Sequence, residues 1–252
     1  MKVLVKGQLV EYSDKGNGRV IILLHGWGSS LKSFTDLSKH LESNYRVVSL
    51  DFPGFGGSPQ PLQDWGVGEY SDFVHDFLEK LKINKPYVLA GHSFGGRVII
   101  KGIHTGVLSS EKVVLIDSAG VRPSDNARKL IFKFIAKSGK AITSLPVLKL
   151  LRPALRNKLY ATAGSTDYLD SGTMKNIFVK TVDEDLLPFV SSIKQPTLLI
   201  WGENDQITPL SEAESLLGQL ADARISIIPG AGHYSYVDNF PVFIKAMDEF
   251  IK

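Results

Sequence analysis

The stretch that decides the fold runs from residue 87 to residue 100 and reads YVLAGHSFGGRVII. An apolar run stops at Gly91, a serine follows at Ser93, and Gly95 and Gly96 precede a second apolar run. Small residues two positions before and after Ser93 allow a strand and a helix to pass close together at a sharp, strained turn. The serine hydroxyl would then project above the edge of a sheet. The N–H groups that open the following helix favour negative charge at the same place.

The same pentapeptide, GHSFG, has a second interpretation. Ser93 is a suitable N-cap residue, and the glycines would then serve only a tight, well-packed turn into a helix. The position of the pentapeptide directly after YVLA and before RVIIKGI favours a nucleophile over a cap, because the strand–turn–helix context is the one that an exposed nucleophilic serine requires.

Apolar runs of the same kind recur along the chain and predict the strands of a parallel sheet. Each run is short, rich in Val, Ile and Leu, and ends in a polar or glycine-containing loop, which is typical of strands buried on both faces. Helix-like stretches separate several of them, and this alternation indicates an α/β fold with helices on both faces of the sheet. The strand runs cover residues 19–28, 45–54, 86–93, 112–120, 196–205 and 224–233, and the helical stretches cover residues 33–43, 68–83, 94–106, 210–220 and 240–252. Residues 1–13 alternate around Lys6-Gly7 like two strands joined by a turn.

Residues 121–193 interrupt this alternation. They have no buried-strand pattern and predict a helical insertion, a cap over the carboxyl edge of a core domain formed by residues 1–120 and 194–252. Within the insertion, residues 122–160 contain ten Lys or Arg and one acid, Asp125. These basic residues either form the solvated faces of the cap helices or attract anionic substrates or an acidic membrane surface.

A serine hydroxyl is a poor nucleophile at neutral pH and needs a base, which in turn needs an orienting acid. Ligand sites in parallel sheets form beyond the carboxyl ends of the strands, so the candidates should follow later strands. His233 follows the last apolar run and is the candidate base. Asp205 follows the preceding run and is the favoured acid, although it also suits a turn or helix N-cap. Asp117, at the end of VVLID, is the rival acid.

The tetrahedral intermediate of such a reaction carries an oxyanion, which needs two N–H donors. The backbone N–H of Phe94, directly after the nucleophile, is one candidate. The loop HGWG at residues 25–28 can bring the backbone of Trp27 to the site as the other, although the loop also suits a simple strand-ending turn.

Several motifs together resemble the α/β-hydrolase family over essentially the whole chain. They are HGWG at 25–28, DFPGFGGS at 51–58, GHSFGG at 91–96, WGENDQITP at 201–209 and GAGH at 230–233. The resemblance implies a mostly parallel, eight-stranded sheet with an inserted helical cap. It also implies Ser93 as nucleophile, Asp205 as acid, His233 as base, and Trp27 and Phe94 as oxyanion donors.

Family members that are epoxide hydrolases or haloalkane dehalogenases have an aspartate at the nucleophile position, so Ser93 points elsewhere. We expect a serine esterase that cleaves small to medium carboxylic esters through an acyl-enzyme. GHSFGGR also resembles hydrolases that cleave a carbon–carbon bond in meta-cleavage products of aromatic compounds. Their best-known members have tryptophan after the histidine, where this chain has Tyr234. A hydrolase-fold receptor with slow turnover is a third possibility of a different class.

Composition narrows the remaining options. The 252 residues include no cysteine, which excludes disulfides and a cysteine nucleophile and fits a reducing compartment. A net charge of +3 is too small a bias to indicate nucleic-acid binding. The N-terminal residues have no secretory apolar region, and no apolar run approaches the length of a membrane span. We expect a cytoplasmic protein without stable membrane insertion, metal or cofactor, acting on a small molecule; the sequence predicts no oligomeric state.

Overall fold

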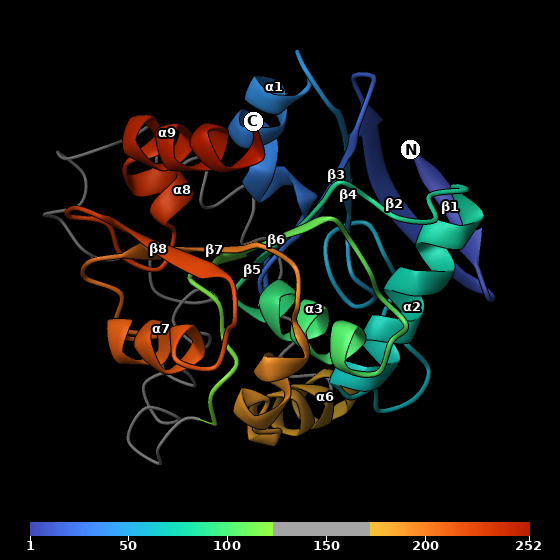
Figure 1. The fold of residues 1–252 in the computed structure, drawn as a ribbon. Coiled ribbons are helices and arrows are strands. Elements are labelled where there is room, and N and C mark those ends of the chain that lie inside the picture. Colours follow the sequence, from blue (N-terminus) through green and yellow to red (C-terminus); the bar gives the residue numbers. More distant parts are fainter. Residues whose placement is uncertain (123–171) are drawn as a thin grey trace, which may run out of the picture.

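The computed structural model describes residues 1–122 and 172–252, and its eight strands form one sheet across the molecule (Figure 1). The strand order is β1-β2-β4-β3-β5-β6-β7-β8, in which β3 to β8 pair in parallel and β1 and β2 are antiparallel. The predicted mostly parallel, eight-stranded α/β fold is confirmed. The strands are β1 (Lys2–Val5), β2 (Gln8–Lys15), β3 (Val20–Leu24), β4 (Arg46–Leu50), β5 (Val88–His92), β6 (Lys112–Ile116), β7 (Thr197–Gly202) and β8 (Ala223–Ile228).

The N-terminal strands β1 and β2 form the predicted hairpin. The two turn residues, Lys6 and Gly7, have φ angles of 45° and 83°. Two successive positive φ angles match the right-handed twist of the strands that they connect. The hairpin extends the sheet at one edge, and Gln8 at the start of β2 donates to the carbonyl of Pro59 in the loop that follows β4.

The central strands alternate between two hydrophobic cores. In β3, Ile22 and Leu24 face one core and Ile21 and Leu23 face the other, so all four side chains are buried. The continuous burial expected for residues 224–233 is wrong for β8, where Ile227 is 44% exposed. This strand lies at the edge of the sheet and has a neighbour on one side only.

Helices cover both faces of the sheet, as predicted (Figure 1). One face carries α1 (Thr35–Leu41), α8 (Ser235–Asp238) and α9 (Phe240–Ile251), with the 3-10 helix η1 (Leu31–Phe34) before α1. The opposite face carries α2 (Val67–Lys80), α3 (Phe94–His104) and α7 (Leu210–Leu217). In the described ranges, no helix is both long and apolar enough to cross a membrane.

The predicted cap, residues 121–193, is described only in part. Its described portion contains α6 (Gly172–Asp183) and the 3-10 helix η4 (Leu187–Ser192), which pack on the same core as α2 and α3. Residues 123–171, and with them all of the basic stretch except Arg122, lie outside the described residues. The division into a core domain and a cap therefore stays a prediction.

Candidate active site

The turn between β5 and α3 holds Ser93 in a strained conformation. Its φ and ψ angles are 51° and −110°, a region that costs a residue with a side chain about 1–3 kcal/mol. The backbone N–H of Ser93 donates to the carbonyl of Ile116 at 3.0 Å, which anchors the turn. A Cβ on Gly91 would lie 2.5 Å from the carbonyl carbon of Gly95, and a Cβ on Gly95 would lie 2.2 Å from the carbonyl oxygen of Leu24. Glycine is therefore required at both positions for the strand and helix to pass this closely.

Ser93 occupies the N-cap position of α3, but its hydroxyl makes no capping hydrogen bond. The hydroxyl oxygen instead lies 3.0 Å from Nε2 of His233, which stands in the loop between β8 and α8. Nδ1 of the same imidazole lies 2.8 Å from Oδ2 of Asp205, in the loop after β7. The structure thus brings all three predicted residues together. With a proton on Nδ1, facing the carboxylate, Nε2 can accept the proton of the serine hydroxyl.

The carboxylate of Asp205 is held by donors on both oxygens. Oδ1 accepts the backbone N–H groups of Ile207 at 2.8 Å and Thr208 at 3.1 Å, and Oδ2 accepts the Thr208 hydroxyl at 2.7 Å. Burial would raise the pKa of Asp205, but the hydrogen bonds from His233 and Thr208 outweigh burial and hold the pKa below its usual value. Asp205 is therefore ionised at neutral pH and can stabilise an imidazolium.

Asp117, the rival acid, is fully buried and has different partners. Its Oδ1 accepts the N–H of Gly202 at 2.8 Å, and its Oδ2 accepts the N–H and hydroxyl of Ser235 at 3.0 and 2.6 Å. Burial raises the pKa of Asp117 to about 7. This carboxylate ties the end of β7 to the start of α8, and so fixes the two loops that carry Asp205 and His233.

Phe94 and Trp27, whose backbone N–H groups are the predicted oxyanion donors, line the pocket that contains Ser93. Phe94 is the first residue of α3, where a helix N–H has no partner within the helix. Trp27 follows β3, and both residues line the same pocket as Ser93. The indole of Trp27 packs against the rings of Phe94 and Phe178, with centroids 5.4 and 5.1 Å away. These contacts hold the loop that carries Trp27 beside Ser93.

Two buried histidines, His25 and His92, support the backbone of the loops around the site, and sequence reasoning missed this role. Nδ1 of His25 lies 2.7 Å from the carbonyl oxygen of Gly26, and its Nε2 accepts the N–H of Phe52 at 3.0 Å. His92 donates from Nε2 to the carbonyl of His233 at 2.7 Å, and its ring lies 4.9 Å from the ring of His233. The sequence offered one indication of this role, because both histidines stand inside the glycine motifs, His25 directly before Gly26 and His92 directly before Ser93.

Replacing His92 by Asn is expected to flatten the loss of stability in acid. Burial lowers the pKa of His92 to about 3 in the folded protein, from 6.5 for an unperturbed histidine. The unfolded chain binds this proton first, so the contribution to stability is complete above pH 6.5 and is lost as the pH falls towards 3. Between pH 6 and pH 4, the free energy of unfolding in urea should fall about 1.4 kcal/mol per pH unit more steeply in the wild type than in His92→Asn. Parallel pH profiles would show that His92 is not held neutral by the fold.

The pocket in front of Ser93 is mostly apolar, with two charged side chains in its wall. They are Arg97, on α3, and Glu212, on α7, and sequence reasoning singled out neither. Arg97 could have been found as the lone charge inside the apolar run that follows the serine. The apolar wall includes Trp27, Phe94, Val121, Phe178, Ile207 and Tyr234.

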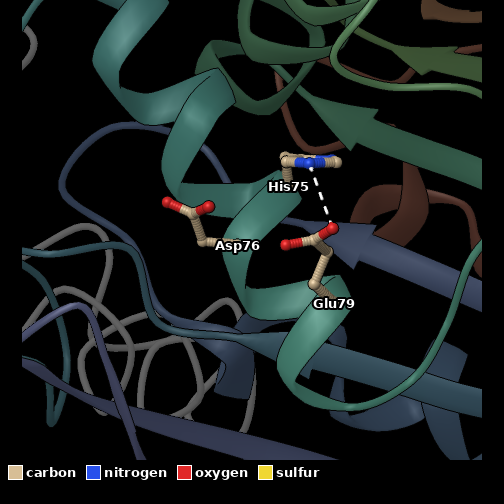
Figure 2. A group of neighbouring side chains, drawn as sticks. All are labelled: His75, Asp76 and Glu79. Carbon is tan, nitrogen blue, oxygen red and sulfur yellow. Dashed lines mark ion pairs between the residues drawn. The ribbon is translucent and has the colours of Figure 1, made fainter.

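A separate group of polar side chains lies on α2 (Figure 2). His75, Asp76 and Glu79 place one potential metal-ligand atom each within 4.8 Å of one another. Nε2 of His75 is 3.7 Å from Oε1 of Glu79, the pair joined by the dashed line in Figure 2, and Asp76 pairs with Lys6 at 2.7 Å. These ion pairs account for the cluster as a partly exposed helix surface.

One class of hydrolase folds combines a parallel sheet, a strained serine at a strand–helix turn and a histidine beyond the last strand. This structure has all three features. The sequence model of the alpha/beta hydrolase family matches residues 21–246, and the chain belongs to this family. It is 27% identical to the 2-hydroxy-6-oxo-6-(2'-aminophenyl)hexa-2,4-dienoic acid hydrolase of Metapseudomonas resinovorans, over 97% of this chain and 88% of that protein. It is 25% identical to the 2-hydroxy-6-oxo-6-phenylhexa-2,4-dienoate hydrolase of Burkholderia cepacia, over 96% of this chain and 91% of that protein. The crystal structure of the enol-lactonase from Burkholderia xenovorans LB400 superposes with a TM-score of 0.83 at 20% identity, covering 100% and 99% of the two chains.

Proposed function

We propose that the chain is a serine hydrolase that cleaves carboxylic esters of small to medium size through an acyl-enzyme intermediate. The observation that carries this proposal is the continuous relay from the Ser93 hydroxyl to Nε2 of His233 at 3.0 Å and from Nδ1 to Asp205 at 2.8 Å. A hydroxyl beside an oriented imidazole gains a general base, which an isolated serine lacks.

In the proposed first half-reaction, His233 takes the proton of Ser93 while the serine oxygen forms a bond to the ester carbonyl carbon. The carbonyl oxygen becomes an oxyanion, which the N–H groups of Phe94 and Trp27 stabilise. Collapse of the intermediate breaks the bond to the alcohol oxygen, and His233 protonates that leaving group. Asp205 keeps the proton on Nδ1 and stabilises the imidazolium throughout.

In the second half-reaction, His233 deprotonates a water molecule that attacks the acyl carbon. The same two N–H groups stabilise the second oxyanion, and the acid leaves when the proton returns to Ser93. The reaction consumes one water per ester and returns the site to its starting protonation state, so no redox partner is required.

Carbon–carbon bond hydrolysis is the second candidate. It is favoured by the similarity to the two dienoate hydrolases, which extends over 96–97% of this chain. The same serine, histidine and backbone donors would act on a ketone in place of an ester.

A panel of p-nitrophenyl esters of increasing acyl length, run beside 2-hydroxy-6-oxo-6-phenylhexa-2,4-dienoate, separates the candidates. We expect many turnovers per protein on the short and medium esters, with a higher kcat/KM than on the dienoate. A higher kcat/KM on the dienoate would replace the ester proposal by carbon–carbon cleavage. Acylation followed by no further turnover on any substrate would contradict both and indicate a receptor.

A further inference from the structure

Arg97 lines the pocket that contains Ser93, and the reaction proposed above does not use it. Arg97 is only 3% exposed and stands on α3, one helical turn after the serine. A guanidinium carries five N–H donors. In the part of the chain that the structure describes, one donor is satisfied, by the backbone carbonyl of Glu184, while Nε is buried and has no hydrogen-bond partner.

Two acids near Arg97, Glu184 and Asp185, have other partners. The carboxylate of Glu184 pairs with Lys101 at 2.7 Å, and Oδ1 of Asp185 accepts the N–H groups of Arg122 and Leu187. Burial lowers the pKa of Arg97 only to about 10, so the side chain remains charged at neutral pH. A buried charge without a short-range counter-ion is costly, and proteins retain such a group where it meets a ligand or a partner charge.

Glu212 is the other charged residue in this wall, and burial raises its pKa to about 7. A carboxyl group with a raised pKa is held partly protonated near neutral pH, so it neutralises Arg97 incompletely. The pocket wall thus combines one cationic side chain that has unused N–H donors with apolar residues that include Trp27 and Phe178.

We propose that Arg97 forms an anion subsite and that the ligands of this pocket are small carboxylates with an apolar or aromatic portion. A carboxylate matches the planar fork of a guanidinium and can accept two of its N–H groups. The apolar portion of the ligand would lie against the wall formed by Trp27 and Phe178. The assignment of these ligands as substrates depends on the proposed function, whereas their binding does not.

A purely structural role for Arg97 would consist of its bond to Glu184, which tethers the segment after α6 to α3. A lysine or a neutral polar side chain could supply a single N–H for that tether. Such a role predicts lower stability after substitution, but no change in the preference of the pocket for an anion over a neutral molecule of the same shape.

Ligand binding to the Ser93→Ala protein separates the two roles, because it requires no catalysis. The probes are 4-phenylbutyrate and its neutral analogue 4-phenylbutyramide, measured by isothermal titration calorimetry. We expect the carboxylate to bind about tenfold to hundredfold more tightly than the amide. Adding Arg97→Met should abolish this preference, and Arg97→Lys should retain part of it, because the charge remains but the fork is lost.

Two further variants make the test specific. Lys101→Met removes the same charge from the same helix, but Lys101 already pairs with Glu184, so the preference should persist. Glu212→Gln removes the competing negative charge, so it should strengthen carboxylate binding, and this holds even if Arg97→Met does not fold.

Several results would overturn the proposal. In the Ser93→Ala protein, these are equal affinity for the two probes or no measurable binding of the carboxylate. In the further variants, they are an unchanged preference for the carboxylate in a folded Arg97→Met protein, weaker carboxylate binding in Glu212→Gln, or equal losses of the preference in Lys101→Met and Arg97→Met. If the wild-type protein fails to hydrolyse esters while the carboxylate preference follows Arg97, the proposed reaction fails and the subsite stands. If esters are hydrolysed without such a preference, the reaction stands and the subsite fails.

Discussion

The Ser93→Ala variant is expected to lose ester hydrolysis by roughly four to six orders of magnitude in kcat, with a small change in KM. Removal of Oγ deletes the atom that would form the acyl bond in the proposed reaction, whereas the apolar pocket wall remains. Steady-state kinetics on p-nitrophenyl butyrate measures the loss, with thermal unfolding to verify that the variant is folded.

Ser118→Ala is the matched control for this substitution. Ser118 is fully buried and lies close to the same turn, because a Cβ on Gly96 would overlap the Ser118 hydroxyl. Unlike the hydroxyl of Ser93, the Ser118 hydroxyl donates to a backbone carbonyl, that of Ala119. We expect near-wild-type kcat in this control. Activity within tenfold of the wild type in folded Ser93→Ala would remove Ser93 as the nucleophile.

The substitution with the next largest expected effect is Asp205→Asn, which should lower kcat by about four orders of magnitude at neutral pH. An asparagine side chain retains the volume but can donate an N–H towards Nδ1 of His233, which favours the wrong tautomer and leaves the imidazolium without a counter-charge. The folded state should be largely retained, because the side-chain oxygen can still accept the N–H groups of Ile207 and Thr208.

Asp117→Asn distinguishes the two acids. The buried amide nitrogen would face the N–H of Gly202 or of Ser235, so the variant should lose about 1–3 kcal/mol in the free energy of unfolding. Its kcat per folded molecule should remain within about tenfold of the wild type, because Asp117 contacts no reacting atom in the proposed mechanism. The reverse pattern, with kcat lost in Asp117→Asn and retained in Asp205→Asn, would exchange the roles of the two residues.

Most of the fold could be predicted because its signals are local. The parallel strands are short apolar runs with polar ends, and glycines at positions 91 and 95 reveal the close strand–helix crossing. The meeting of Ser93 and His233 followed from topology, since parallel strands bring their carboxyl ends to one edge of a sheet. The exposure of Ile227 could not be predicted, because no local pattern in this run identifies β8 as the edge strand.

The details of the site depend on side-chain directions that sequence spacing leaves open. Asp117 and Asp205 follow neighbouring strands, and hydrogen bonds from distant residues decide which carboxylate faces the imidazole. Arg97 stands out in the sequence as a lone charge in an apolar run, but only the packing of α3 against neighbouring segments shows that it is buried in the pocket wall. His92 likewise acquires its role from contact with a backbone carbonyl 141 residues away.

Peptide mapping after labelling with a fluorophosphonate probe shows directly which residue attacks an electrophile. Full-length protein is treated with the probe, digested and analysed by mass spectrometry, with Ser93→Ala protein treated in parallel. The expected result is one adduct per chain on Ser93, formed as ester hydrolysis disappears, and no adduct in the variant. An adduct on another residue, or complete labelling elsewhere with Ser93 unmodified and activity lost, would contradict the assignment of Ser93 as the nucleophile.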